Sequence, residues 1–338
     1  MASAEQLKAL LRSHMEGDDS QFYSVAMQLA AHEAKLGHGK LADELRALID
    51  KAKSERSPFA VRSSTPTPLA QPKGELSSLL TASFPRYQLS DLILTSELKG
   101  QLEKTIREQR QFAKIREHGL GPRRKLLLVG PPGTGKTMTA AVLAGELGLP
   151  LFNVRLDALM SKYLGESAGK LRLIFDAVAS HRGVYLFDEF DAVASQRGLG
   201  NDVGEVRRVL NSFLQLMEHD QSNSVLVAAT NHPELLDRAV FRRFDDVLEF
   251  ATPGPDQVKK VLLARLGSFA PKKFDWIKTA NIADGMSYAD LVRAAESAIK
   301  DAIISDKEKI DAEALIASIA EQRVRSLRGD SQQAREKP

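Results

Sequence analysis

The sequence contains no cysteine, which excludes a disulfide framework and thiolate metal sites. It also has no uncharged apolar run near the roughly 18 to 20 residues that cross a bilayer. The first residues have no basic region followed by an apolar one, as a signal peptide would. We therefore predict a cytoplasmic protein that does not act in a membrane.

A strong excess of one charge is missing as well. The 47 basic and 44 acidic side chains leave a net charge of only +3, so nucleic-acid binding is not implied. In contrast, hydrophobic residues make up 43% of the 338 positions, enough for a full core and about two domains.

The composition changes several times along the chain. Residues 1–54 have helical periodicity and predict a small N-terminal bundle, and residues 55–84 are rich in Ser, Pro and Thr and predict a flexible linker. Residues 85–254 have the pattern of an α/β subdomain, whereas residues 255–325 have only helical periodicity and predict a lid. Residues 326–338 are too polar for an ordered segment and are expected to form a tail.

Within the α/β segment, short apolar runs alternate with helical patterns. These runs lie at residues 125–129, 150–154, 184–187, 224–229 and 247–250. Such alternation predicts a parallel sheet with helices on both faces. In the lid segment, the helical patterns cover residues 257–266, 287–305 and 311–321.

A glycine-rich segment, GPPGTGKT, follows the first apolar run and precedes a helical pattern. Its residues are Gly130, Pro131, Pro132, Gly133, Thr134, Gly135, Lys136 and Thr137. This is the strand and helix context of a P-loop, in which bare backbone N–H groups bind phosphate oxygens at a helix N-terminus. Lys136 would reach the β- and γ-phosphates of ATP, and Thr137 would bind Mg²⁺. A chance glycine-rich turn is the alternative, and the context disfavours it.

The segment VYLFDEF ends an apolar strand with two carboxylates, Asp188 and Glu189. Acids at the end of a buried strand are costly unless they have partners. Downstream of a P-loop, Asp188 fits the acid that organises Mg²⁺, and Glu189 fits the base that polarises the attacking water. An ordinary helix cap after a strand is the alternative for this pair when it is taken alone.

The next strand, SVLVAATN, ends in Asn231. A neutral amide there could hydrogen-bond the attacking water or the γ-phosphate without repelling either. Because asparagine after a strand is ordinarily a turn residue, this interpretation depends on the two motifs before it.

Together these motifs resemble the AAA branch of the AAA+ ATPases. GPPGTGKT, LFDEFDA, AATN and LDRAVFRRFD occur in the order of the family, and the resemblance covers nearly all of residues 87–322. It implies an α/β P-loop core with strand order 5-1-4-3-2 and a helical lid. It also implies ATP and Mg²⁺ bound where the two meet, with the adenine near Leu92 to Leu94.

Two further segments resemble parts of ring-forming motors. In LDRAVFRRFD, Arg242 and Arg243 match the arginine fingers that the family sends into the neighbouring subunit's site, and their adjacency resembles spastin and katanin. Which arginine is the main finger stays open, as does a role in binding a nearby acid at a helix end. In SKYLGES, Lys162 and Tyr163 resemble the first pore loop, with core packing of Tyr163 as the alternative.

The resemblance implies a homohexameric ring that unfolds or remodels protein substrates, with the N-terminal bundle recruiting them. A loader or helicase acting on nucleic acid is an alternative. Those proteins present a lid arginine to the γ-phosphate, but Ala289 stands at that place in DGMSYADL, with Arg293 nearby. A nucleotide-gated scaffold or adaptor is a second alternative, against which Glu189 and the two arginines argue. No zinc-protease motif is present, because His32-Glu33 lacks a second histidine at position 36, so a protease partner would be a separate chain.

Overall fold

The computed structural model describes residues 25–27, 29–30, 38, 42–44, 72, 74–159, 166–191, 202–271 and 274–335. The chain divides into two compact units, Met1–Ala60 and Val61–Pro338. In the first unit, the described residues at 25–27, 29–30 and 42–44 are helical, and Ala26, Ala30 and Ala42 are buried. The rest of the predicted N-terminal bundle lies outside the described residues.

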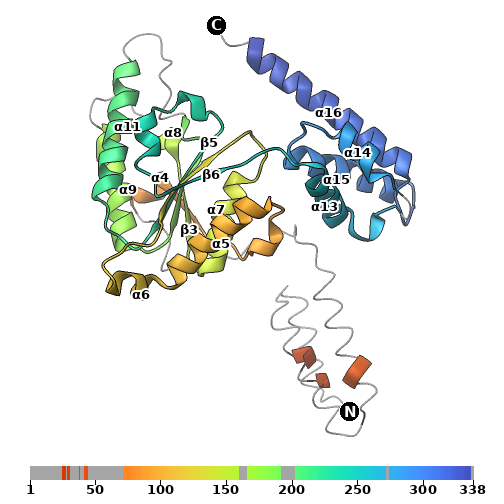
Figure 1. The fold of residues 1–338 in the computed structure, drawn as a ribbon, viewed down its shortest axis with the longest axis horizontal. Coiled ribbons are helices and arrows are strands. Elements are labelled where there is room, and N and C mark those ends of the chain that lie inside the picture. The colour runs from red at the N-terminus through yellow and green to blue at the C-terminus, as the bar shows by residue number, and fades with distance from the viewer. Residues whose placement is uncertain are drawn as a thin grey trace. The chain divides into compact units, whose positions relative to one another are not determined.

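A six-stranded sheet lies at the centre of the second unit (Figure 1). Its strands are β1 (Leu80–Ser83), β2 (Lys125–Val129), β3 (Leu151–Val154), β4 (Val184–Phe187), β5 (Val225–Thr230) and β6 (Asp246–Glu249). They are arranged in the order β1-β3-β4-β5-β2-β6. Strands β2 to β6 are parallel, and, numbered along the chain, they have the predicted order 5-1-4-3-2.

The first strand was not predicted. Residues Leu76–Leu79 form helix α4, and β1 pairs antiparallel with β3 from Leu80 opposite Val154 to Ser83 opposite Leu151. The linker predicted over residues 55–84 is therefore wrong in its last part. The side chains of Leu79 and Leu80 are buried in the core beneath the sheet edge, but a pair of leucines after a Ser/Pro-rich stretch has no periodicity that would indicate this.

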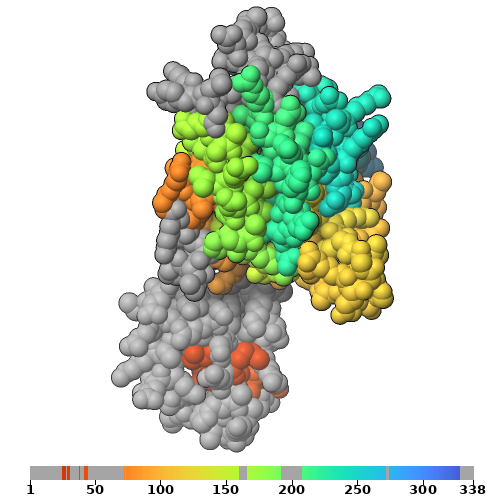
Figure 2. Space-filling view, turned by 90° about the vertical axis from the view of Figure 1, so that its left-hand side faces the viewer, coloured from red at the N-terminus to blue at the C-terminus, as the bar shows by residue number. Residues whose placement is uncertain are grey.

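Alternate side chains of each strand enter two separate cores, one on each face of the sheet. On β4, Tyr185 and Phe187 belong to one core, and Val184 and Leu186 belong to the other. The first core is covered by α9 (Glu166–Ser180) and α11 (Asp202–His219), and the second by α5 (Ser96–Arg110) and α7 (Lys136–Leu147). Figure 2 shows α9 and α11 side by side across the first face, with α4 and β1 at its edge.

Short elements connect these layers. They are η2 (Leu89–Asp91), α6 (Phe112–Glu117), α8 (Leu156–Leu159), η3 (Pro233–Leu235) and α12 (Arg238–Phe241). Helix α12 begins at an N-cap, Asp237, whose carboxylate accepts a hydrogen bond from the Ala239 N–H.

The lid is a helical layer with a core of its own. It consists of α13 (Pro255–Leu266), η4 (Gly267–Phe269), α14 (Trp276–Ile282), α15 (Tyr288–Ile304) and α16 (Ala312–Arg335). Helix α16 continues to Arg335, so most of the tail predicted at residues 326–338 is helical. Once Leu315 and Ile319 fix the start of this helix in the lid core, the following Gln, Ala and Arg residues are good helix formers and extend it. Among the described residues, no helix is long and apolar enough to cross a membrane.

Candidate functional site

The P-loop connects the carboxyl end of β2 to the first turn of α7. Three of its glycines have positive φ, namely Gly130 (147°), Gly133 (73°) and Gly135 (99°). At Gly130, a Cβ atom would lie 2.1 Å from the carbonyl oxygen of Phe250, so only glycine fits between the loop and the segment after β6. The loop therefore places the N-terminus of α7 at the edge of the sheet formed by the carboxyl ends of its strands, with its N–H groups available to an anion.

Lys136 is the first residue of α7, and its side chain folds back over the loop. Its Nζ donates hydrogen bonds to the carbonyl oxygens of Gly130, at 2.7 Å, and Pro131, at 2.8 Å. Burial lowers the pKa of Lys136, while the nearby charges of Asp188 and Asp191 act in the opposite direction. The ammonium group is thus held inside the curve of the P-loop.

Thr137 and Asp188 meet at the same edge of the sheet. The Thr137 hydroxyl donates to Asp188 Oδ2 at 2.6 Å, which brings together a residue of α7 and the end of β4. A hydroxyl and a carboxylate are oxygen donors of the kind that Mg²⁺ binds through one or two protein groups and phosphates. The residues present therefore fit a magnesium ion bound together with a nucleotide.

Glu189 directly follows Asp188 and has an unusual backbone conformation. Its φ is 52°, in the left-handed region that non-glycine residues seldom occupy. The turn is fixed on both sides, because Asp188 Oδ1 accepts the Glu189 N–H at 2.9 Å and the Phe190 N–H donates to the Ala229 carbonyl at 2.8 Å. Strain held in this way is typical of functional positions, and it leaves the Glu189 side chain exposed at the site.

Asn231 is positioned by a residue that the sequence analysis did not identify. Asp191 Oδ1 accepts hydrogen bonds from the Thr230 hydroxyl, at 2.9 Å, and from the Asn231 N–H, at 3.3 Å. The carboxylate thus links the turn after β4 to the end of β5. The second aspartate in LFDEFDA was the available signal, because a third acid so close to two functional ones needs a partner of its own.

The two adjacent arginines have different surroundings. Arg243 Nε lies 2.5 Å from Glu218 Oε1 at the end of α11, and its Nη1 donates to the Ala239 carbonyl at 3.4 Å. Arg242 is exposed, and its side chain has no hydrogen bond or ion pair with any part of the chain that the structure describes. Binding to a nearby acid, the alternative considered for the pair, therefore applies to Arg243.

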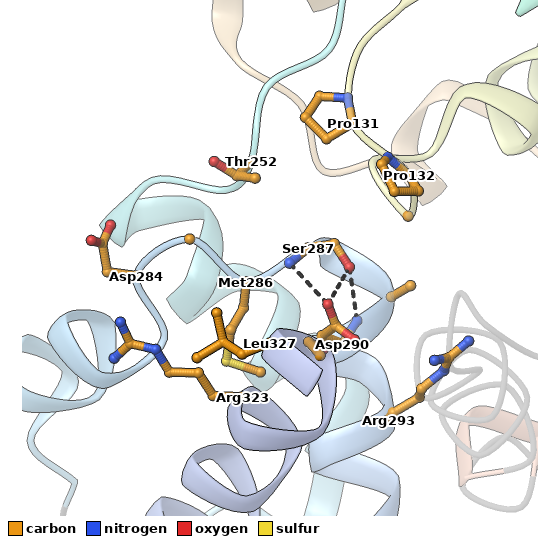
Figure 3. A pocket seen from close by; sticks show the side chains of 14 residues that line it. Pro131, Pro132, Thr252, Asp284, Met286, Ser287, Asp290, Arg293, Arg323 and Leu327 are labelled. Atoms are coloured by element: carbon orange, nitrogen blue, oxygen red, sulfur yellow. Dashed lines mark hydrogen bonds between the residues drawn. The ribbon is translucent and has the colours of Figure 1, made fainter. Parts of the chain in front are cut away.

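The lid touches the P-loop directly. The Ala289 N–H donates to the Gly133 carbonyl at 3.1 Å, and a Cβ atom at Gly133 would lie 2.6 Å from Ser287 Oγ. A cavity of about 560 Å³ lies beside this contact, between the P-loop, Thr252, the start of α15 and α16 (Figure 3). Ala289 is thus a contact residue, and Arg293 lines the same cavity.

The segment expected near the adenine lies between the α/β subdomain and the lid. Leu92 and Leu94 pack against the core on the α7 face of the sheet, whereas Ile93 packs against the lid core. The resemblance placed the adenine where the two parts meet, and this segment does join their cores.

Comparisons with known proteins identify the family. The family model described as "ATPase family associated with various cellular activities (AAA)" matches residues 126–252. An uncharacterized AAA family ATPase, y4kL of Sinorhizobium fredii, is 36% identical over 312 residues, which are 92% of this chain and 92% of that protein. The chain belongs to the AAA family of ATPases.

Two other relatives of this AAA ATPase are longer than this chain. A putative 26S proteasome regulatory subunit homolog of Methanothermobacter thermautotrophicus is 33% identical over 60% of this chain and 55% of that protein. The ATP-dependent zinc metalloprotease FtsH 4 of Sphaerobacter thermophilus is 33% identical over 68% of this chain but only 36% of that protein. The AAA domain of FIGL-1 has the same fold, with a TM-score of 0.56 and 23% identity over 77% of this chain and 92% of that chain.

The AAA ATPase therefore binds nucleotide and hydrolyses ATP. Its fold brings the P-loop together with the predicted residues that follow β4 and β5. Lys136 and Thr137 lie at the start of α7, and Asp188, Glu189 and Asn231 follow two neighbouring parallel strands. Phe190, which anchors the Glu189 turn, was not predicted. Its side chain is fully buried and packs against Phe213 with ring centroids 4.9 Å apart, a contact that forms only in the folded chain. The predicted pore-loop residues, Lys162 and Tyr163, lie outside the described residues.

Proposed function

We propose that this AAA ATPase is a motor that unfolds or remodels protein substrates in the pore of a homohexameric ring. Its relatives support a role on proteins, since their names refer to a proteasome regulatory subunit homolog and an ATP-dependent protease. The observation that carries the proposal is the exposed Arg242, which has no partner in the described part of its own chain although it follows the last turn of α12. An arginine finger of a shared site needs such a position.

The residues at the sheet edge take separate roles in hydrolysis. Lys136 opposes the charge of the β- and γ-phosphates, and Thr137 and Asp188 hold Mg²⁺, which neutralises phosphate charge when it is bound. Glu189 orients the attacking water and accepts its proton. Asn231 hydrogen-bonds the water or the γ-phosphate from the end of β5.

Arg242 completes the site of the next subunit. Charge spreads over the transferring phosphoryl group, and an arginine supplied by a neighbour can accelerate hydrolysis by about 10³ to 10⁵. Because this residue comes from another copy of the chain, hydrolysis requires assembly. A monomer that binds ATP would then turn it over slowly.

The proposed roles of the pore loop and of the N-terminal unit rest on the sequence. Lys162 and Tyr163 are proposed to grip the substrate in the pore, and the unit at residues 1–60 to recruit it. An aromatic side chain suits a grip that does not depend on sequence, because it offers a large apolar face with little conformational entropy to lose. Because the chain has no HExxH motif, coupling to proteolysis would require a separately encoded protease.

One observation weighs against the loader or helicase alternative. Ala289 occupies the lid position that touches the P-loop, and its contact to Gly133 is made by the main chain. A short side chain at this place supplies no charge to a phosphate. Stimulation of ATP turnover by single-stranded nucleic acid, with none by unfolded protein, would favour that alternative.

Tyr163 provides the test that separates a protein motor from a nucleotide-gated scaffold. With a model unfolded protein as substrate, Tyr163→Ala should abolish ATP-dependent unfolding but leave basal ATP turnover within a few-fold of wild type. Tyr163→Phe is the matched control and should work, because the ring face makes the contact. A lower melting temperature with a proportionate loss of every activity would instead place Tyr163 in the core, where truncation of an aromatic costs about 3 to 5 kcal/mol.

A further inference from the structure

The contact between the P-loop and the lid is unusually close. It is made at Gly133, whose positive φ and missing Cβ allow Ser287 and Ala289 to approach its main chain. The Ala289 N–H also donates to the Gly133 carbonyl. A shift of the P-loop at this residue is therefore passed to the first turn of α15.

Asp290, the next residue, fixes this turn through a capping box. Its Oδ2 accepts hydrogen bonds from the Ser287 hydroxyl, at 2.7 Å, and from the Ser287 N–H, at 3.3 Å, while Ser287 Oγ accepts the Asp290 N–H at 3.2 Å (Figure 3). This reciprocal pair satisfies two donors at the start of the helix. The same serine that lies against Gly133 is therefore held by Asp290.

The second oxygen of this carboxylate points to another helix. Asp290 Oδ1 accepts a hydrogen bond from Gln322 Nε2 of α16 at 3.0 Å. Burial opposes ionisation of Asp290, but hydrogen bonds from Ser287, Ser326 and Gln322 outweigh it and hold its pKa below the ordinary carboxyl value. A charged acceptor makes these bonds stronger than bonds between neutral groups.

Helix α16 changes its mode of attachment along its length. Its first half is anchored by the buried side chains of Leu315 and Ile319. After them Gln322 reaches Asp290 and Arg323 Nη1 donates to the Ile282 carbonyl at 3.0 Å, while Val324 is 48% exposed. The later part of α16 is therefore attached where the lid meets the P-loop.

We propose that Asp290 is a positioning residue that couples nucleotide binding at the P-loop to the part of α16 from Gln322 to Arg335. One carboxylate joins Ser287, which touches Gly133, to Gln322 of α16. Nucleotide in the P-loop steadies the first turn of α15 and, through Asp290, this part of α16. Because coupling between two sites is reciprocal, a ligand or neighbouring chain that holds α16 changes nucleotide affinity by the same factor. This inference needs the P-loop and the lid but not the proposed ring or its substrate.

Hydrogen exchange of the full chain, with and without saturating ADP, tests this coupling without hydrolysis. In the wild type, ADP should slow exchange of the α16 amides from Gln322 onward. Gln322→Ala removes the amide donor of α16 but leaves the capping box and the Ser326 bond to Asp290 intact. It should reduce this protection and raise the Kd for ADP several-fold, while ADP still protects the P-loop.

Two further variants sharpen the result. Asp290→Asn keeps an acceptor but loses the charge, so it should weaken the protection of α16 and the affinity for ADP in the same direction as Gln322→Ala. Glu321→Ala is the matched control, because Glu321 is adjacent on α16 but exposed and paired with Arg325, one turn further along. It should behave as the wild type.

Three results would overturn the proposal. The first is an absence of ADP-dependent protection of α16 in the wild type. The second is a lower melting temperature of Gln322→Ala with unchanged ADP affinity and protection, which would make the bond purely structural. The third is an equal loss in Glu321→Ala, because the coupling would then not run through Asp290.

Discussion

The phosphate-binding edge of the sheet and helix α12 hold their charged residues in different ways. At the sheet edge, Lys136 binds two main-chain carbonyls, Asp188 accepts from Thr137, and Asp191 accepts from Thr230 and Asn231. After α12, Arg242 is exposed without a partner in the described part of the chain. Groups proposed to act within their own subunit are thus positioned by their own chain. A group proposed to act on another subunit is left available.

The largest expected effect comes from removing the cation of the P-loop. Lys136→Ala should abolish detectable ATP binding in titration calorimetry, because no other group replaces its charge against the β- and γ-phosphates. Lys170→Ala is a matched control, since Lys170 is also a partly buried lysine, whose Nζ donates to the Ala158 carbonyl at 3.0 Å but lies on α9. An unchanged affinity of Lys136→Ala would refute the P-loop assignment.

The next effect separates binding from chemistry at the same edge. Glu189→Gln keeps the size of the side chain but removes the base, so hydrolysis should fall by about 10² to 10⁴. ATP binding, measured by calorimetry, should be retained. Hydrolysis at the wild-type rate would show that another residue accepts the proton.

Variants of the two arginines test the contrast between the sheet edge and helix α12. Arg242→Ala should slow hydrolysis in the assembled ring by about tenfold or more with little change in nucleotide affinity. Arg243→Ala should slow hydrolysis less than Arg242→Ala, because the Arg243 guanidinium is paired with Glu218 of its own chain. Arg243→Ala and Glu218→Ala should lower the stability of the fold by similar small amounts, since a partly exposed ion pair contributes at most about 1 kcal/mol. A larger loss in Arg243→Ala than in Arg242→Ala would reverse the assignment of the finger.

The smallest effect is expected at Asp191. Asp191→Asn keeps an acceptor for the Thr230 hydroxyl but weakens the link to Asn231, so turnover should fall by a few-fold and ATP affinity should stay unchanged. Steady-state kinetics would resolve this as a change in kcat with a constant KM. A higher KM with an unchanged kcat would mean that Asp191 does not act through Asn231.

The sheet order was predicted through the family resemblance that the motifs carry, and the structure has this order. GPPGTGKT and LFDEFDA constrain both the local backbone and the place of each residue after a strand. β1 was missed because its burial depends on contacts with distant parts of the chain, such as the pairing of Leu80 with Val154. The extension of α16 was missed because the residues after Arg325 are mostly polar, although they are good helix formers that continue a helix anchored by Leu315 and Ile319.

Within the site, some features of single residues also depend on distant parts of the chain and could not be predicted from the sequence. The positive φ of Glu189 has no signal in the sequence, since the turn that holds it is fixed by a hydrogen bond from Phe190, after β4, to Ala229 of β5. The difference between Arg242 and Arg243 depends on Glu218 at the end of another helix. The conformation of Glu189 and the difference between the two arginines both depend on tertiary contacts, although the motifs had identified these residues as candidates.

A mixing experiment tests the central claim, that the active site is shared between subunits. Wild-type protein is combined with increasing amounts of Arg242→Ala subunits, which retain Lys136 and bind ATP, and total ATP turnover is measured. We expect turnover to fall further than the activities of the separate proteins would add up to, because each variant subunit also slows the site of its wild-type neighbour. Strictly additive activity at every ratio would contradict a shared site.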